Sequence, residues 1–235
     1  MKNRLLIFII IIIIGSDLRG QTTKTTFGLQ YKPIIPVEYF NPSSIKKNEG
    51  NYEFNLTKKY SHSFGMILRR EINKTFSIEY GLNYTQRNYK LNINNQIENI
   101  DDFTSFGMRS YEIPLQLLTY VRASKYWYLN VAFGISHNIL ASDILSYGNA
   151  TAIYFQNTYR KSGGYRALLA NIGVDYRTEN TGRYYIGASL HMPSAEIGRI
   201  YPEYNEFNNE NFEEKFFVDM PGNFITIDFR YFFKE

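Results

Sequence analysis

The chain has no cysteine, one tryptophan and three histidines among its 235 residues. The absence of cysteine excludes disulfides, thiolate metal sites, a cysteine nucleophile and a lipid anchor on an acylated cysteine. The chain also has no apolar run of about 20 residues, the length that a membrane-spanning helix needs. Without disulfides the fold must be held together in another way, such as the closed hydrogen-bond ladder of a β-barrel.

Charge of one sign is also scarce. The formal net charge is +4, and residues 1–20 hold three basic side chains and one acidic side chain. The remainder of the chain therefore carries about +2, which is too little to indicate a nucleic-acid partner.

The N-terminus resembles an export signal. Lys2 and Arg4 give it a charged start, and residues 5–14 form an unbroken apolar run. A run of about ten apolar residues suits the core of a signal peptide. We expect a cleavable signal peptide over residues 1–20 and a single mature domain over residues 21–235. The alternative is a retained N-terminal anchor.

Aromatic residues are abundant, at 17% of the chain, with 21 tyrosines and 18 phenylalanines. Many lie in segments where apolar and polar residues alternate, and the clearest of these is residues 75–88. Successive side chains of a strand point to opposite faces of the sheet. This segment therefore has one aromatic face, which suits lipid, and one face of small or charged residues, which suits a narrow lumen. A soluble barrel would place the apolar face inside instead.

The same alternation recurs along the chain and predicts eight strands, at residues 25–31, 60–70, 75–88, 110–122, 127–136, 168–177, 184–192 and 224–233. Short connections alternate with long polar ones: residues 71–74, 123–125 and 178–182 are short, whereas 32–59, 91–109, 138–165 and 193–223 are long. Outer-membrane barrels keep short turns in the periplasm and long loops outside. The predicted fold of residues 21–235 is all-β, an eight-stranded antiparallel up-and-down transmembrane β-barrel of the bacterial outer membrane.

Pro114 conflicts with this pattern, because proline cannot donate to the ladder of a closed sheet. We expect a bulge or a locally broken hydrogen bond near the outer rim. The alternative is that this strand starts after Pro114.

The segments Tyr111-Glu112-Ile113-Pro114-Leu115 and Tyr126-Trp127-Tyr128-Leu129-Asn130-Val131-Ala132-Phe133-Gly134 resemble the outer membrane protein beta-barrel family. Its members are small porin-like proteins of Bacteroidetes, many labelled PorT-family. The resemblance implies the fold and the location, and it carries no catalytic motif. The residues Phe229, Tyr231 and Phe233 resemble the C-terminal signal recognised by barrel-assembly machinery, although Lys234 and Glu235 follow them.

Charged residues on the polar faces predict an ion-paired network that plugs the lumen, because buried charges persist only when they are paired. Counting from the turns places Arg87 and Glu112 at similar depth. It also groups Asp175 and Asp228 with Arg230 in the periplasmic half, where Gly187 would leave space. The predicted network consists of Arg69, Glu79, Arg87, Glu112, Arg122, Asp175, Arg177, Asp228 and Arg230. The alternative is that these charges line an ion path.

The long connections carry acidic and aromatic residues. The acidic ones, in residues 203–214, could bridge divalent cations to lipopolysaccharide or a partner, or could simply be solvated. The aromatic ones could contact partners or form the outer aromatic girdle. They are Tyr39, Phe40, Tyr154, Phe155, Tyr159, Tyr201, Tyr204, Phe207 and Phe212.

The sequence shows no catalytic, cofactor-binding or metal-ligand motif; its histidines, His62, His137 and His191, have no metal-site spacing. We therefore expect a non-enzymatic envelope or surface protein, or a component of a secretion apparatus. Its expected partners are outer-membrane lipid, lipopolysaccharide, barrel-assembly machinery and an envelope protein. The alternatives are a narrow porin, a lipid enzyme of the outer membrane and a soluble ligand-carrying barrel.

Overall fold

The computed structural model describes residues 24–35, 44–95, 97, 99–150, 154–204 and 216–234. The expected signal peptide lies outside these residues. So do Tyr39, Phe40, Phe207 and Phe212, together with the acidic residues Glu206, Glu210, Glu213 and Glu214.

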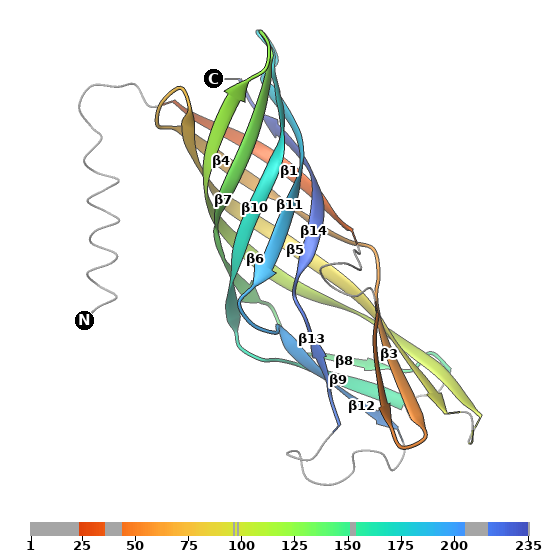
Figure 1. Ribbon diagram of the computed structural model, residues 1–235. Helices are drawn as coiled ribbons and strands as arrows, with labels where there is room; N and C mark the ends of the chain where they lie inside the picture. The colour runs from red at the N-terminus through yellow and green to blue at the C-terminus, as the bar shows by residue number, and fades with distance from the viewer. Residues whose placement is uncertain are drawn as a thin grey trace, which may run out of the picture.

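Eight long strands form a closed antiparallel ring, as the alternation predicted (Figure 1). Each strand pairs with the next along the ring, and β1 pairs with β14 to close it. In ring order the strands are β1 (Thr25–Ile35), β4 (Ser61–Glu71), β5 (Phe76–Asn95), β6 (Ile100–Arg122), β7 (Trp127–Leu140), β10 (Gly164–Arg177), β11 (Arg183–Pro193) and β14 (Phe224–Phe232). Closure leaves no unpaired edge in the ring.

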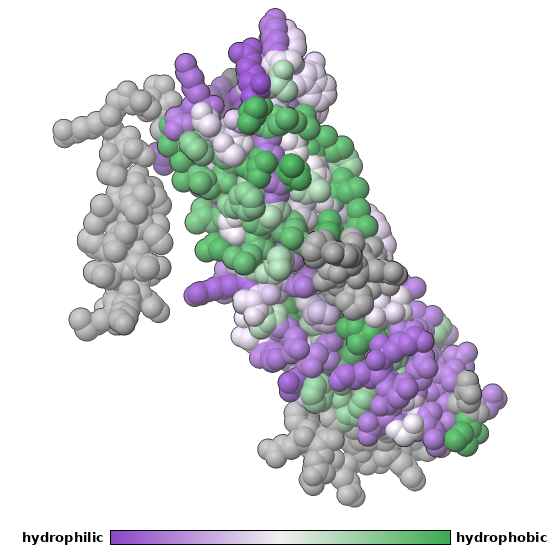
Figure 2. Space-filling model, viewed as in Figure 1, coloured by the Kyte–Doolittle hydropathy of each residue, from purple (hydrophilic) through white to green (hydrophobic). Residues whose placement is uncertain are grey.

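The alternation in the sequence decides which face of each strand is buried. On β5, Ser77 and Glu79 are buried in the lumen, whereas Phe76 and Tyr80 are exposed on the outer wall. Phe133 of β7 is 65% exposed on the same wall. Such side chains form a broad apolar band on the face of the barrel that Figure 2 shows. An apolar wall around a polar interior is the arrangement of a membrane barrel.

The three short turns and the C-terminus lie at one end of the ring, which we call the turn end (Figure 1). In the first turn, the backbone N–H groups of Thr75 and Phe76 both donate to the Asn73 side chain at 2.8 Å. Gly182 closes the last turn at φ +114°, a backbone conformation that suits glycine. By the rule for outer-membrane barrels, we expect the turn end to face the periplasm.

At the other end, the outer end, the prediction of long polar loops was wrong. β5 and β6 continue far past their predicted limits, and much of the remaining chain forms strands. The hairpin of β2 (Ser44–Glu49) and β3 (Tyr52–Lys58) pairs with the extension of β5. The strands β13 (Val218–Met220), β12 (Gly198–Tyr204), β9 (Tyr154–Arg160) and β8 (Ile144–Tyr147) form a second sheet in that order.

The polarity of the strands is inverted at the outer end. On β5 the inward residues Tyr89, Leu91 and Ile93 are buried in an apolar core, while Lys90 and Asn92 point outward. The change occurs because the surroundings change: water lies outside this part of the wall, so the apolar face turns inward. Figure 2 shows the corresponding hydrophilic surface beyond the apolar band. We call the extensions of β5 and β6, the β2–β3 hairpin and the four-stranded sheet together the outer β-structure.

Pro114 lies inside β6, so the alternative that the strand starts after it was wrong. The pairing of β5 with β6 includes Tyr80 with Leu115 and Asn83 with Glu112, but omits the two positions between them. The expected local break is therefore present. Because β6 runs from Ile100 at the outer end to Arg122 at the turn end, Pro114 lies in the half of the strand nearer the turn end. The break is therefore within the barrel wall and not near the outer rim.

Among the described residues, no helix has the length and apolar character needed to cross a membrane.

Candidate functional site: the barrel lumen

The lumen near the turn end is crossed by a network of buried ion pairs. Arg69 of β4 lies 2.6 Å from Glu79 of β5 and 2.9 Å from Asp175 of β10. Arg230 of β14 lies 2.7 Å from Glu79 and 2.6 Å from Asp228. Every one of these side chains is fully or almost fully buried. We call this group, together with Lys32, the charged layer.

Lys32 completes the charged layer. Its Nζ lies 3.8 Å from Asp228, and its side chain is buried. Sequence reasoning had assigned this residue to a loop and missed it. The alternation of Thr26, Gly28 and Gln30 on the inner face of β1 could have indicated it, because Lys32 is the next residue of that series. With Lys32, the layer holds three basic and three acidic side chains.

Aromatic rings hold the guanidinium groups of the layer. Arg69 lies over the ring of Phe232 at 4.0 Å and over that of Tyr120 at 5.6 Å. Arg230 lies over the ring of Tyr185 at 4.6 Å. Planar guanidinium groups stack favourably on aromatic faces, so these rings support the ion pairs and fill the lumen.

The sequence suggested that Gly187 leaves space for the charged residues. In the structure that space is occupied by Tyr185 instead. A Cβ atom at Gly187 would lie 2.0 Å from the Tyr185 hydroxyl, and one at Gly173 would lie 2.3 Å from it. That hydroxyl donates to Asn171 at 2.7 Å. The glycines are therefore needed for the approach of a tyrosine, which sequence reasoning missed.

A second polar layer lies farther from the turn end. His191 Nδ1 lies 3.0 Å from Glu112, the Asn83 amide donates to Glu112 at 2.9 Å, and Gln30 donates to Asn83 at 2.5 Å. The His191 ring stacks on Phe224, with 4.2 Å between ring centroids. These side chains come from β1, β5, β6 and β11, so the layer also crosses the lumen.

Arg87 does not pair with Glu112, which corrects the prediction that they lie at similar depth. Strand register places Arg87 opposite Met108, and Glu112 opposite Asn83. Arg87 instead donates to the Tyr165 hydroxyl of β10 at 2.6 Å and to the Gly222 carbonyl at 3.2 Å. It forms a third crossing, next to the apolar core of the outer β-structure on the side that faces the turn end.

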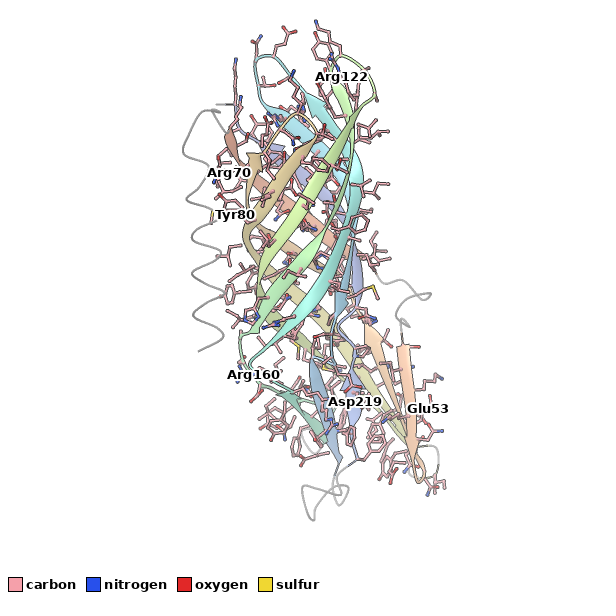
Figure 3. All side chains as sticks on the ribbon, turned by 60° about the vertical axis from the view of Figure 1, so that its left-hand side comes forward. Glu53, Arg70, Tyr80, Arg122, Arg160 and Asp219 are labelled. Carbon is pink, nitrogen blue, oxygen red and sulfur yellow. The ribbon has the colours of Figure 1, made fainter. Side chains whose placement is uncertain are left out.

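Two predicted members of the network lie elsewhere. Arg122 is exposed at the turn end, where its Nε donates to the Ser124 carbonyl at 3.0 Å (Figure 3). Arg177 stacks on the ring of Tyr128 at 3.8 Å and has no ion pair among the described residues. Both belong to the ends of their strands, where the lumen opens to water.

The predicted assembly signal lies on the outer wall of β14. Phe229 and Phe233 are exposed, and Phe233 stacks on Phe27 with 5.7 Å between centroids. The Tyr231 hydroxyl donates to the Thr181 carbonyl. The described residues hold no group of three or more histidine, aspartate or glutamate side chains placed to bind a metal.

The described loop aromatics have two different positions. Tyr154 and Tyr201 are buried within the outer β-structure, and Phe155 and Tyr159 lie on the outer face of its four-stranded sheet. Glu203 accepts a hydrogen bond from Asn157 at 3.2 Å. The girdle near the outer limit of the band is formed instead by other residues, including Tyr31, Tyr60, Phe64, Tyr84 and Tyr111.

A closed ring with an apolar wall and a charged, filled interior defines an integral outer-membrane β-barrel. The family model described as outer membrane protein beta-barrel domain matches residues 24–191, and the chain belongs to that family. It is accordingly a protein of the outer membrane. No curated protein matches the chain.

One solved structure supports the fold, and a second shows a weaker likeness. The outer membrane protein OprG from Pseudomonas aeruginosa superposes with a TM-score of 0.57 at 10% identity, over 93% of this chain and 100% of that one. The outer membrane protease OmpT from Escherichia coli gives a TM-score of 0.32 at 7% identity, over 91% of this chain and 97% of that one. The last value is too low to support an argument.

Proposed function

We propose that this protein is a non-enzymatic, closed barrel that anchors the outer β-structure in the membrane and contacts other molecules of the envelope through it. The observation that supports this most directly is the triple crossing of the lumen. Ion pairs of Arg69 and Arg230, the His191–Glu112 pair and the Arg87–Tyr165 hydrogen bond each join strands across it.

The alternative is a narrow porin, and the contents of the lumen argue against it. An eight-stranded barrel has an interior just wide enough for side chains. Here that interior is occupied by paired charges and rings, and beyond them lies the apolar core of the outer β-structure. An ion would have to displace buried pairs and then pass through apolar side chains, which is costly.

The outer β-structure offers a surface for partners. Leu145 and Tyr147 of β8 are 52% and 58% exposed, and the rings of Tyr147 and Phe155 lie 6.0 Å apart. Tyr159 is exposed on the same sheet face. Aromatic residues are enriched where proteins bind one another. An envelope protein is the partner that this surface suits.

Other partners are proposed from the rest of the molecule. The apolar band suits membrane lipid and lipopolysaccharide, and Phe229, Tyr231 and Phe233 suit recognition by barrel-assembly machinery. A role in a secretion apparatus, as in the PorT-family branch of Bacteroidetes, rests only on the resemblance of the Tyr111–Gly134 region. Export by a cleavable signal peptide rests on residues 1–20.

Conductance of the refolded protein in planar bilayers tests the closed lumen. A heat-modifiability gel first confirms that the sample is folded, and an open porin in the same bilayer serves as the positive control. We expect a folded band and no steady conductance. Steady conductance that changes with Arg230→Ala or Asp228→Ala would make transport the function instead. If the folded protein does not conduct, cross-linking in cells is the next step to identify its partners.

A further inference from the structure

The inner face of the barrel ends at the turn end in a ring of mainly basic residues. Alternation along each strand gives the last inward position, and we call these positions the turn-end mouth. Five of the eight are basic, one is acidic and two are uncharged: Lys24, Glu71, Thr75, Arg122, Tyr126, Arg177, Arg183 and Lys234. Arg122 is seen at this end in Figure 3.

Lys24 has an interaction partner, so the charge of the mouth is counted from its other four basic side chains, of which only one is balanced by an acid of the mouth. Arg183 lies 2.7 Å from Glu71, which uses the single carboxylate of the ring. Arg177 is held by the rings of Tyr128 and Tyr120, at 3.8 Å and 4.8 Å, and not by an acid. The buried Nε of Arg177 and the buried Nη1 of Arg183 have no hydrogen-bond partner among the described residues. They are donors in place for an acceptor.

The charged layer beneath does not supply the missing negative charge. Its three carboxylates, Glu79, Asp175 and Asp228, already pair with Arg69, Arg230 and Lys32. The mouth thus keeps a surplus of positive charge above a neutral floor. A surface that gathers charge of one sign concentrates ligands of the opposite sign.

We propose that the turn-end mouth is a binding site for a small polyvalent oxyanion, a carboxylate or phosphate compound, that enters from the periplasm. Guanidinium groups bind carboxylate and phosphate through two parallel hydrogen bonds. The opening of an eight-stranded barrel is too narrow for a folded domain, so an anion that binds at the mouth, outside the filled part of the lumen, must be small. This site lies at the opposite end from the outer β-structure, and it does not depend on the proposed contacts there.

Calorimetric titration of the full chain, refolded in zwitterionic micelles, tests the site. The probes are citrate and pyrophosphate, each compared with sodium chloride at the same ionic strength. We expect saturable binding of at least one probe, and none of chloride. The double variant Arg122→Gln, Lys234→Gln removes two exposed charges of the mouth and should weaken binding about tenfold.

A matched control removes two exposed charges from the outer end of the barrel. The double variant Arg109→Gln, Arg166→Gln should bind both probes as the unaltered protein does. Arg177→Lys keeps the charge but loses the two-pronged donor, so it should also weaken binding. A heat-modifiability gel establishes that each variant is folded.

The outcomes separate the alternatives. Binding of citrate alone assigns the site to carboxylates, and binding of pyrophosphate alone assigns it to phosphates; both support the proposal. Absence of saturable binding to either probe overturns it. Equal weakening by the two double variants also overturns it, because the attraction would then belong to the net charge and not to the mouth.

Discussion

Arg69 and Asp175 meet across the full width of the barrel. They belong to β4 and β10, which lie four positions apart in the ring of eight strands, and their side chains approach to 2.9 Å. Arg69 also pairs with Glu79 and is fully buried. A contact between opposite walls both closes the lumen and fixes the distance between them.

Breaking this pair should strongly destabilise the barrel. Asp175→Asn leaves the Arg69 guanidinium with one acid fewer, and removal of one partner of a buried pair costs about 3–5 kcal/mol. Urea unfolding in lipid vesicles, followed by Trp127 fluorescence, measures the change. The exposed Arg122→Gln should change the unfolding free energy by less than about 0.5 kcal/mol. An Asp175→Asn barrel as stable as this control would show that the pair does not support the fold.

Filling the space beside Tyr185 should also destabilise the barrel. In Gly187→Ala the new methyl group would meet the Tyr185 hydroxyl at 2.0 Å and the Ile172 carbonyl at 2.5 Å. Overpacking of this kind costs about 1–3 kcal/mol. The matched control is Gly163→Ala, where no atom lies within 4 Å. The same unfolding assay applies, and equal stability of the two variants would contradict the close approach.

The inversion of polarity along β5 predicts that neighbouring residues respond in opposite ways. Leu91→Asp puts a charge into the core of the outer β-structure, where Leu91 is 0% exposed. It should unfold that part while the barrel stays heat-modifiable, because an unpaired charge cannot be buried there. Asn92→Asp, on the outward face, should have little effect. Limited proteolysis of the outer segments measures the difference, and equal protease resistance of both variants would refute the inversion.

Lys58, on the outer β-structure, predicts a dependence on pH. Burial, with a smaller contribution from the positive charge of Arg87, lowers the pKa of Lys58 from 10.5 to about 8. Below pH 8 the ammonium is charged in both the folded and unfolded chains, so the cost of burying this charge lowers the stability of the folded chain in full. As the pH rises from 8 towards 10.5 the folded chain loses the proton first, and stability increases.

Urea-dependent proteolysis of the outer β-structure checks this at about pH 7.5 and pH 9.5. We expect greater resistance at the higher pH, and Lys58→Met should abolish the difference. The exposed neighbour Lys59 provides the control, since Lys59→Met should leave the difference in place. A protein that becomes less resistant at the higher pH would contradict the sign of the shift.

The alternation of residues such as Phe76, Ser77 and Glu79 was sufficient to predict the strands, their inward faces and the eight-stranded ring. Alternation is a local property, because each strand residue points away from its neighbours, and so it can be read directly from the sequence. The charged character of the lumen follows from the same pattern.

Which charges meet was decided only by the tertiary structure. Arg69 reaches Asp175 because ring closure brings β4 and β10 to opposite walls at the same depth, and Arg87 misses Glu112 because of the register of β5 and β6. Neither property is encoded in a local pattern. The outer β-structure was missed for a related reason: its strands are stabilised by an apolar core assembled from distant segments. In the sequence alone, the many polar, water-facing residues of these strands are typical of loops.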